Sequence, residues 1–234
     1  EFSQLSIGGA AAGVIDESNY ARVVPHVNLA LTALYRRFPL KDGRLVLHLV
    51  DGQRLYSLHS KYDLNNTRSR EPVKYLAAEA GLFVDDVLKV ERVVTEPGTQ
   101  LPLNDGFARY GVETPTATVL RLPAELVAQG PDLPDDLKTE TLEISYRAAH
   151  PKVVVTEGLF EPTRVQLLLP PSHLEALLYF VAARVSQPVG MSPQDQTSNT
   201  FYAKYEAACM ELENKGLYID QGSGFDRLRD RGFV

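Results

Sequence analysis

The sequence contains a single cysteine, Cys209, among its 234 residues. One cysteine can form neither an intrachain disulfide nor a thiolate metal cluster. Cys209 falls beside an apolar helical stripe, where a small buried residue is the usual role of a free cysteine. We therefore expect a fold that needs no disulfide and a protein made in a reducing compartment.

Long apolar runs and an excess of positive charge are also missing. No stretch approaches the ~18 apolar residues that a bilayer-spanning helix needs, and the N-terminus has no basic and then apolar signal pattern. The formal net charge is −6 and the sequence pI is about 5.4, which argues against a surface that wraps nucleic acid tightly. These absences predict a soluble protein without membrane contact, and they leave open a channel through which DNA slides.

The common catalytic motifs are absent as well. The sequence has no G-x-S-x-G elbow, no H-E-x-x-H, no G-x-G-x-x-G after a strand and no C-x-x-C, and its glycine-rich segment 8–13 lacks the Lys-Ser or Lys-Thr of a phosphate loop. Five histidines are scattered along the chain: His26, His48, His59, His150 and His173. We predict no enzyme, no cofactor and no metal site. One alternative stays open, a hydrolase built on carboxylates at Asp105, Asp135 or Asp136, although the last two lie in a proline-punctuated loop typical of solvated turns.

What the sequence does contain is strong helical periodicity near its start. Apolar residues recur at steps of three and four from Tyr20 to Phe38, and Asp16 or Ser18 can cap a helix there. Pro25 lies in the early turns, where it either kinks the helix or marks its start. Arg36 and Arg37 would lie in the last turn, where they favour the helix dipole. A phosphate or an acidic partner is the alternative role for these two arginines.

A second helical region spans residues 170–217. Ser172 with Glu175 predicts a capping box, and Pro188 and Gly190 end the first helix. Ser192 and Pro193 can open the next helix, and Gly216 can end it in a left-handed conformation. Two apolar stripes are predicted, Leu174, Leu177, Leu178, Val181 and Val185 on the first helix and Phe201, Tyr205, Ala208 and Leu212 on the second. The short connection favours an antiparallel helical hairpin.

The middle of the chain reads as β-rich. Asp51-Gly52 lies between two apolar runs, which predicts a type I′ hairpin. Residues 72–82 are expected to form a short helix that ends at Gly81. Further strands are predicted at 87–100, 117–122, 141–147 and 153–156, with a last apolar run at 165–169.

Together these patterns predict an α+β fold. Segments 1–39 and 169–217 would form a helical bundle, and 40–168 would form an inserted antiparallel β-rich lobe. Segment 218–234 would be a C-terminal docking tail behind a hinge at 222–224, unless it folds back on its own domain. The predicted partner-docking residues in this tail are Phe225, Leu228, Arg229, Arg231, Phe233 and Val234.

Segments 169–184 and 201–209 resemble head-to-tail connector (adaptor) proteins of tailed bacteriophages. The similarity lies in an ALxxxVAAR pattern at Ala176–Arg184, followed after a break by a helix with the Tyr202-x-x-Tyr205 spacing and the run Lys204-Tyr205-Glu206. The helix at 20–38 with the Asp-Gly hairpin after it looks like the opening of the same class. The resemblance covers about half of the chain.

This resemblance implies a structural virion protein of the neck, made in the host cytoplasm. Twelve copies would form a ring, a dodecamer, that binds the portal protein and a tail or nozzle protein. The ring would continue the DNA channel used in DNA ejection, without sequence-specific contact to DNA. A tail-terminator or baseplate subunit is an alternative within the same class, and a cytosolic regulatory binding module is an alternative from another class.

Overall fold

The computed structural model describes residues 17–79, 81–156, 160–185 and 195–216. The chain divides into two compact units. Residues 1–40 and 150–234 belong to the first, called here the helical unit, and residues 41–149 form the second, called the β unit. The described residues contain four α-helices and two antiparallel sheets, so the fold is α+β, as the sequence predicted.

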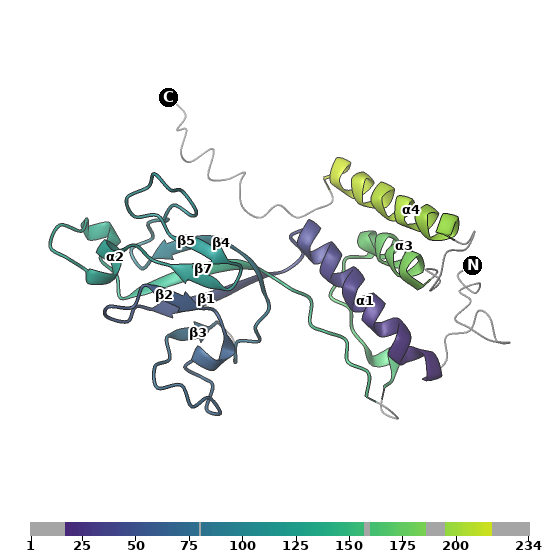
Figure 1. Ribbon diagram of the computed structural model, residues 1–234, viewed down its shortest axis with the longest axis horizontal. Helices are drawn as coiled ribbons and strands as arrows, with labels where there is room; N and C mark the ends of the chain where they lie inside the picture. The colour runs from purple at the N-terminus through teal and green to yellow at the C-terminus, as the bar shows by residue number, and fades with distance from the viewer. Residues whose placement is uncertain (1–16, 80, 157–159, 186–194, 217–234) are drawn as a thin grey trace. The chain divides into compact units, whose positions relative to one another are not determined.

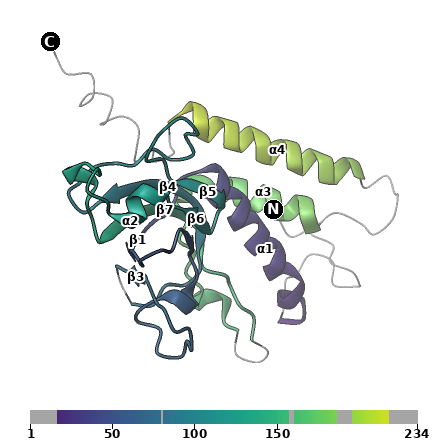
Figure 2. The ribbon, with the colours of Figure 1, turned by 60° about the vertical axis from the view of Figure 1, so that its left-hand side comes forward.

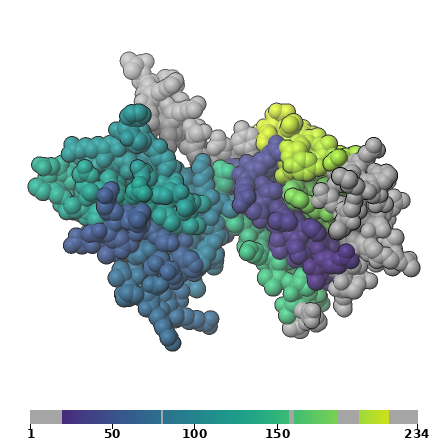
Figure 3. All heavy atoms as spheres, viewed as in Figure 1, coloured from purple at the N-terminus to yellow at the C-terminus, as the bar shows by residue number. Residues whose placement is uncertain are grey.

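Three long helices make up the helical unit: α1 (Glu17–Arg37), α3 (Leu174–Val185) and α4 (Asp195–Asn214). Two short 3₁₀ turns, η3 (Pro162–Arg164) and η4 (Pro171–His173), precede α3. Helix α3 contacts both α1 and α4, and the three helices lie side by side in Figures 1 and 2. In the space-filling view the purple, green and yellow surfaces of α1, α3 and α4 adjoin one another (Figure 3).

The helices share one apolar core, which residues from both ends of the sequence build. Helix α1 runs through Pro25, so this proline does not mark its start. Because apolar residues at helical spacing form a single stripe, α1 turns its predicted face inward. The buried residues of this core are Val23, Ala30, Leu31, Leu34, Phe38, Ala176, Leu177, Phe180, Val181, Tyr205, Cys209 and Leu212.

The predicted apolar face of α3 is only partly correct. Leu177 and Val181 are buried, but Leu174 and Leu178 stay 47% and 38% exposed. Ala176, Phe180, Ala182 and Ala183 are buried in addition. Helix α3 packs against α1 and α4, so its buried face is wider than the single predicted stripe and is rotated relative to it. Leu174 and Leu178 therefore stay on the surface.

The predicted capping box at Ser172 does not form. Pro170 and Pro171 lead into the 3₁₀ turn η4, so α3 begins at Leu174 and Ser172 lies before its first turn. The Glu175 carboxylate accepts a hydrogen bond from the Tyr179 hydroxyl at 2.9 Å. At the far end of α4 the prediction is confirmed, because Gly216 has a φ of +60°. Ser192 and Pro193 lie outside the described residues.

The segment after the β unit was expected to continue it, with a strand at 153–156 and an apolar run at 165–169, which is wrong. These residues belong to the helical unit and have no regular strand structure. The backbone of Val153 forms its hydrogen bonds with a side chain of α1 and not with a neighbouring strand. The Asn28 side-chain amide donates to the Val153 carbonyl and accepts from the Val153 N–H, both at 2.9 Å. The Tyr20 and Phe160 rings also meet edge to face, 5.2 Å apart. The boundary therefore falls at 149/150 and not at 168/169.

The β unit holds two sheets and one short helix. The first sheet has the order β3-β1-β7-β4 and the second β2-β6-β5, with all neighbours antiparallel. The strands are β1 (Asp42–His48), β2 (Leu55–Ser57), β3 (Leu76–Ala78), β4 (Val87–Thr95), β5 (Glu113–Thr116), β6 (Val119–Arg121) and β7 (Thr141–Ala148), with helix α2 (Ala124–Ala128) and 3₁₀ turns η1 (Ser60–Tyr62) and η2 (Asp135–Leu137). The predicted inward face of β7, Leu142, Ile144 and Tyr146, is buried. The strand prediction for 141–147 is confirmed, and the prediction for 87–100 is confirmed as far as Thr95, where β4 ends and the chain turns.

Two predictions in the β unit are wrong. The runs on either side of Asp51-Gly52 do not pair, because β1 lies in the first sheet and β2 in the second. Only Gly52 has a positive φ, +72°, whereas a type I′ hairpin needs two such residues, so the turn sends the chain into another sheet. The expected helix at 72–82 is also absent; Leu76–Ala78 form edge strand β3.

The two ends of the β unit are held together. The Ala148 N–H donates to the Lys41 carbonyl at 2.8 Å, and the Ala149 N–H donates to the Asp86 carbonyl at 2.7 Å. The Asp86 carboxylate accepts from the Lys41 ammonium at 2.7 Å and from the Tyr146 hydroxyl at 2.9 Å. Because the entering and leaving strands are neighbours, this unit can be inserted into another without separating that unit's chain ends.

Candidate interaction sites

Arg37 joins the end of α1 to α4. Its guanidinium donates to Glu206 at 2.6 Å and to the two oxygens of Glu213 at 2.7 and 3.2 Å. The hydrogen bond to Glu213 is the main cause that raises the pKa of Arg37, and the same bond lowers the pKa of Glu213. Charged hydrogen bonds of this kind with fork geometry are among the stronger polar contacts. Two carboxylates of its own chain therefore occupy the Arg37 guanidinium.

Two histidines are buried in the helical unit. His150 accepts from the Leu168 N–H through Nε2 at 3.0 Å and lies 2.5 Å from the Pro151 carbonyl through Nδ1, so both ring nitrogens serve the backbone. His173 packs edge to face on Phe38, 4.8 Å between ring centres. Its Nε2 has no hydrogen-bond partner among the described residues, and burial lowers the pKa of His173. Both rings have packing roles here.

The carboxylates of the hydrolase alternative serve local contacts. Asp135 pairs with Lys138 at 2.7 Å, and this hydrogen bond lowers the pKa of Asp135. Asp136 accepts from the Thr99 hydroxyl at 3.1 Å, and Asp105 accepts from the Phe107 N–H at 3.0 Å. Within the described residues, no group of three or more His, Cys, Asp or Glu side chains is placed to hold a metal ion.

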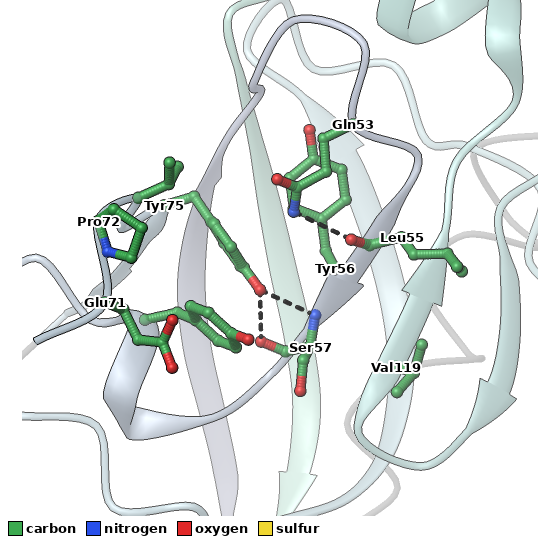
Figure 4. A pocket seen from close by; sticks show the side chains of 10 residues that line it. Gln53, Leu55, Tyr56, Ser57, Glu71, Pro72, Tyr75 and Val119 are labelled. Atoms are coloured by element: carbon green, nitrogen blue, oxygen red, sulfur yellow. Dashed lines mark hydrogen bonds between the residues drawn. The ribbon is translucent and has the colours of Figure 1, made fainter. Parts of the chain in front are cut away.

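A pocket of about 350 Å³ lies beside strand β2 in the β unit. We call it the tyrosine pocket, since three tyrosines take part in its wall (Figure 4). Tyr62 and Tyr75 are stacked 4.7 Å apart, and Tyr56 meets Tyr75 edge to face at 5.1 Å. The pocket is lined by Gln53, Leu55, Tyr56, Ser57, Tyr62, Glu71, Pro72, Val73, Tyr75 and Val119.

Tyr75 also closes the free edge of strand β2. Its hydroxyl accepts from the Ser57 N–H at 3.0 Å and donates to the Ser57 carbonyl at 3.2 Å, as Figure 4 shows. Burial raises the pKa of Tyr75 to about 12, so the hydroxyl keeps the proton that it donates. An edge strand with open backbone groups can accept a further strand. Here the Tyr75 hydroxyl occupies the N–H and the carbonyl of Ser57.

The most exposed large apolar residue of the described chain is Phe107, whose exposed fraction is 102%. It stands on the loop formed by residues 103–112, called here the Phe107 loop. The Asp105 carboxylate accepts from the Phe107 N–H, and the Asn104 N–H donates to the Val112 carbonyl at 2.8 Å. Asn104, at a φ of +55°, also accepts from the Thr114 N–H at 2.7 Å. The loop is therefore braced, although its aromatic side chain touches nothing that would bury it.

The six predicted docking residues, Phe225, Leu228, Arg229, Arg231, Phe233 and Val234, lie outside the described residues. Neither the tyrosine pocket nor the exposed Phe107 was predicted from the sequence. A signal for Phe107 was present, since a large apolar residue directly follows the turn residues Asn104-Asp105-Gly106. No local signal marks the pocket, because its tyrosines meet only when the chain is folded.

The sequence matches no protein-family model and no curated protein. Among the described helices, none has both the length and the apolar content needed to cross a bilayer. The interaction sites are therefore interpreted from their own geometry.

Proposed function

We propose that this protein is a structural virion protein, a head-to-tail adaptor that forms a ring of twelve copies. In this proposal the ring joins the portal to the tail and continues the DNA channel. The helical unit acts as a bundle that packs against its siblings, and the segment 218–234 acts as a C-terminal tail that docks on the portal.

The observation that carries the proposal is which segments of the chain form the helical unit. The helices that carry the resemblance to phage connectors, α3 and α4, contact each other and join α1 in one core. The β unit is a continuous insert between α1 and α3. The apolar patterns of the sequence predicted this division in outline, with helices from both ends and a β-rich middle.

Apolar side chains on the outside of the helical unit favour packing between copies. Leu174 and Leu178 form an exposed pair one turn apart on α3, and Leu29 on α1 is 52% exposed. Identical subunits that contact through two different surfaces form a closed ring when the rotation between them closes. The net charge of −6 would disfavour adhesion of DNA to a channel wall.

The test is the mass of the assembled protein. Native mass spectrometry of the purified full chain should show a species twelve times the subunit mass of 25.9 kDa. The same ring should bind isolated portal assemblies. A protein that stays monomeric at all concentrations and ignores the portal would overturn the proposal.

Truncation tests the role of the tail. A chain that ends at residue 224 should keep the thermal unfolding profile of the full chain, because no described core residue is removed. Its binding to the portal should be lost or weakened at least about tenfold, as expected when an interface loses its aromatic and arginine anchors. Unchanged portal binding by the truncated chain would contradict this role.

A further inference from the structure

The Phe107 loop and the tyrosine pocket lie at opposite edges of the same three-stranded sheet. The sheet order is β2-β6-β5. The pocket is built around edge strand β2, and the Phe107 loop runs directly into the other edge strand, β5. Phe107 is fully exposed in its own chain, so it does not fill the pocket beside β2 of the same molecule.

We infer that Phe107 of one copy of this chain inserts into the tyrosine pocket of the next copy. This inference rests on the proposed ring, and it adds the contact that joins neighbouring β units. A projection at one edge and a cavity at the other make a heterologous interface, in which each copy uses one of each. Such an interface is the kind that generates rings.

The chemistry of the two surfaces matches. A volume of about 350 Å³ is ample for one phenyl ring, since ligand pockets of several hundred Å³ hold whole small molecules. Leu55 and Val73, which line the pocket, are 55% and 44% exposed and would be covered by the incoming ring. The tyrosine rings of the wall offer edge-to-face contacts, which aromatic pairs prefer.

Each of the two surfaces carries one charge of each sign. Phe107 stands between Asp105 and Arg109 on its loop. The pocket wall carries Glu71, which pairs with Lys61 at 3.0 Å. An inserted loop could set Arg109 near the Glu71 carboxylate and Asp105 near the Lys61 ammonium. Opposite charges at an interface rim favour one register over others.

The pocket favours a single side chain as its occupant over an added β-strand. Strand addition to β2 would need the Ser57 backbone groups, and the Tyr75 hydroxyl already bonds both of them. The backbone of the Phe107 loop is braced, and the phenyl group has only two side-chain torsions to fix on binding, so the entropy cost is small. Aromatic anchors of this kind often dominate the energy of an interface.

Cysteine crosslinking tests the contact in the full chain. The double variant Gly106→Cys with Val73→Cys keeps the phenyl group of Phe107, and a Cβ at Gly106 meets nothing within 4 Å. It should form a ladder of covalent oligomers under mild oxidation, because each copy offers one half of the contact on each side. The only native cysteine, Cys209, is buried and adds no competing thiol at the surface. The matched control replaces Val73→Cys by Val84→Cys, at a position 69% exposed in the same unit and outside the pocket. This control should form at least about tenfold less crosslinked product.

A second pair of variants tests direction. Phe107→Ala keeps the pocket, and Val73→Trp keeps the phenyl group while filling the pocket. Each alone should raise the concentration for half-assembly by about tenfold or more, with circular dichroism unchanged because both positions are exposed. An equimolar mixture should regain one contact and form heterodimers.

The outcomes separate this inference from the proposed function. A crosslinked ladder with the pocket pair and not with the control supports the contact. Rings of wild-type protein in which the pocket pair does not crosslink, or in which Phe107→Ala assembles normally, overturn the contact and leave the adaptor proposal in place. A wild-type protein that never assembles overturns both.

Discussion

The two units differ in how the chain builds their cores. The β unit is one continuous segment, and its entering and leaving strands are bonded to each other near Lys41, Asp86 and Ala148. The helical unit is discontinuous, and its core joins α1 to helices that follow more than a hundred residues later. The β unit is thus complete in its own chain segment, whereas the helical unit depends on contacts between distant segments.

This difference teaches where each unit is vulnerable. Contacts between distant segments carry a loop-closure cost that the inserted β unit reduces by keeping its ends together. A change in the helical core should therefore release the helices from one another and leave the β unit folded. A substitution in the core of the β unit should destabilise its sheets and leave the helical core largely intact.

The largest effect is expected for Leu34→Ala in the helical core. Leu34 is fully buried in α1, and truncation of such a leucine costs about 2–5 kcal/mol of unfolding free energy. Hydrogen exchange should show faster opening of α1, α3 and α4, with the protection of β1 and β7 unchanged. Arg22→Ala, exposed on the same helix, is the control and should cost no more than about 0.5 kcal/mol. Equal loss of protection in both units would show that they do not unfold separately.

Alanine substitutions at two glycines test the packing of the β unit. A Cβ added at Gly43 of β1 would lie 2.3 Å from Cζ of Tyr146, whereas one at Gly106 would meet nothing within 4 Å. Overpacking of this kind costs about 1–3 kcal/mol. Urea unfolding should therefore show Gly43→Ala destabilising the β unit and Gly106→Ala leaving it unchanged within about 0.5 kcal/mol. Equal stability of the two variants would contradict the packing of Tyr146 over β1.

Acid should weaken the helical unit through His173. Burial lowers the pKa of His173 in the folded state, so the unfolded chain, with a histidine pKa of about 6.5, binds the proton more readily. The stability from the neutral ring is present above about pH 6.5 and is lost as pH falls from there toward the folded pKa, by at most about 1.4 kcal/mol per pH unit. Thermal unfolding between pH 7.5 and 5 should show a smaller slope for His173→Gln. His59→Gln, in the β unit, is the control. An unchanged slope in His173→Gln would count against a buried neutral ring.

The smallest effect is expected for Arg37→Gln. The side chain is 24% exposed and its partners Glu206 and Glu213 are 34% and 42% exposed, so solvent screens the pairs. We expect a loss of about 0.5–1 kcal/mol that shrinks in 1 M salt. Lys215→Gln removes a fully local pair with Glu211 on α4 and should have almost no effect. A double-mutant cycle between Arg37→Gln and Glu213→Gln measures the coupling, and a coupling near zero would show that the pair does not join the helices.

Local patterns predicted the elements better than their partners. The helices α1, α3 and α4 and the strands β4 and β7 follow from the spacing of apolar residues within one segment. The pairing of β1 with β7 does not, because it joins Leu45 to Ile144 across the whole β unit. The strand expected at 153–156 failed for the same reason, since its apolar pattern was correct but Asn28 of a helix, and not another strand, bonds Val153.

The candidate sites were less predictable than the fold. The tyrosine pocket needs Tyr56 from β2 beside Tyr62 and Tyr75, an arrangement that only the folded sheet creates. Arg37 was recognised as a helix-end charge, but its partners on α4 are not readable from spacing. The predicted docking tail, 218–234, lies outside the described residues and stays a prediction.

The most direct measurement compares the isolated β unit, residues 41–149, with the same residues in the full chain by amide NMR. The account predicts a dispersed spectrum and cooperative unfolding for the isolated unit, with amide shifts of β1, β4 and β7 that match those of the full chain. A collapsed spectrum, or shifts that differ throughout these strands, would contradict the claim that the β unit closes on itself.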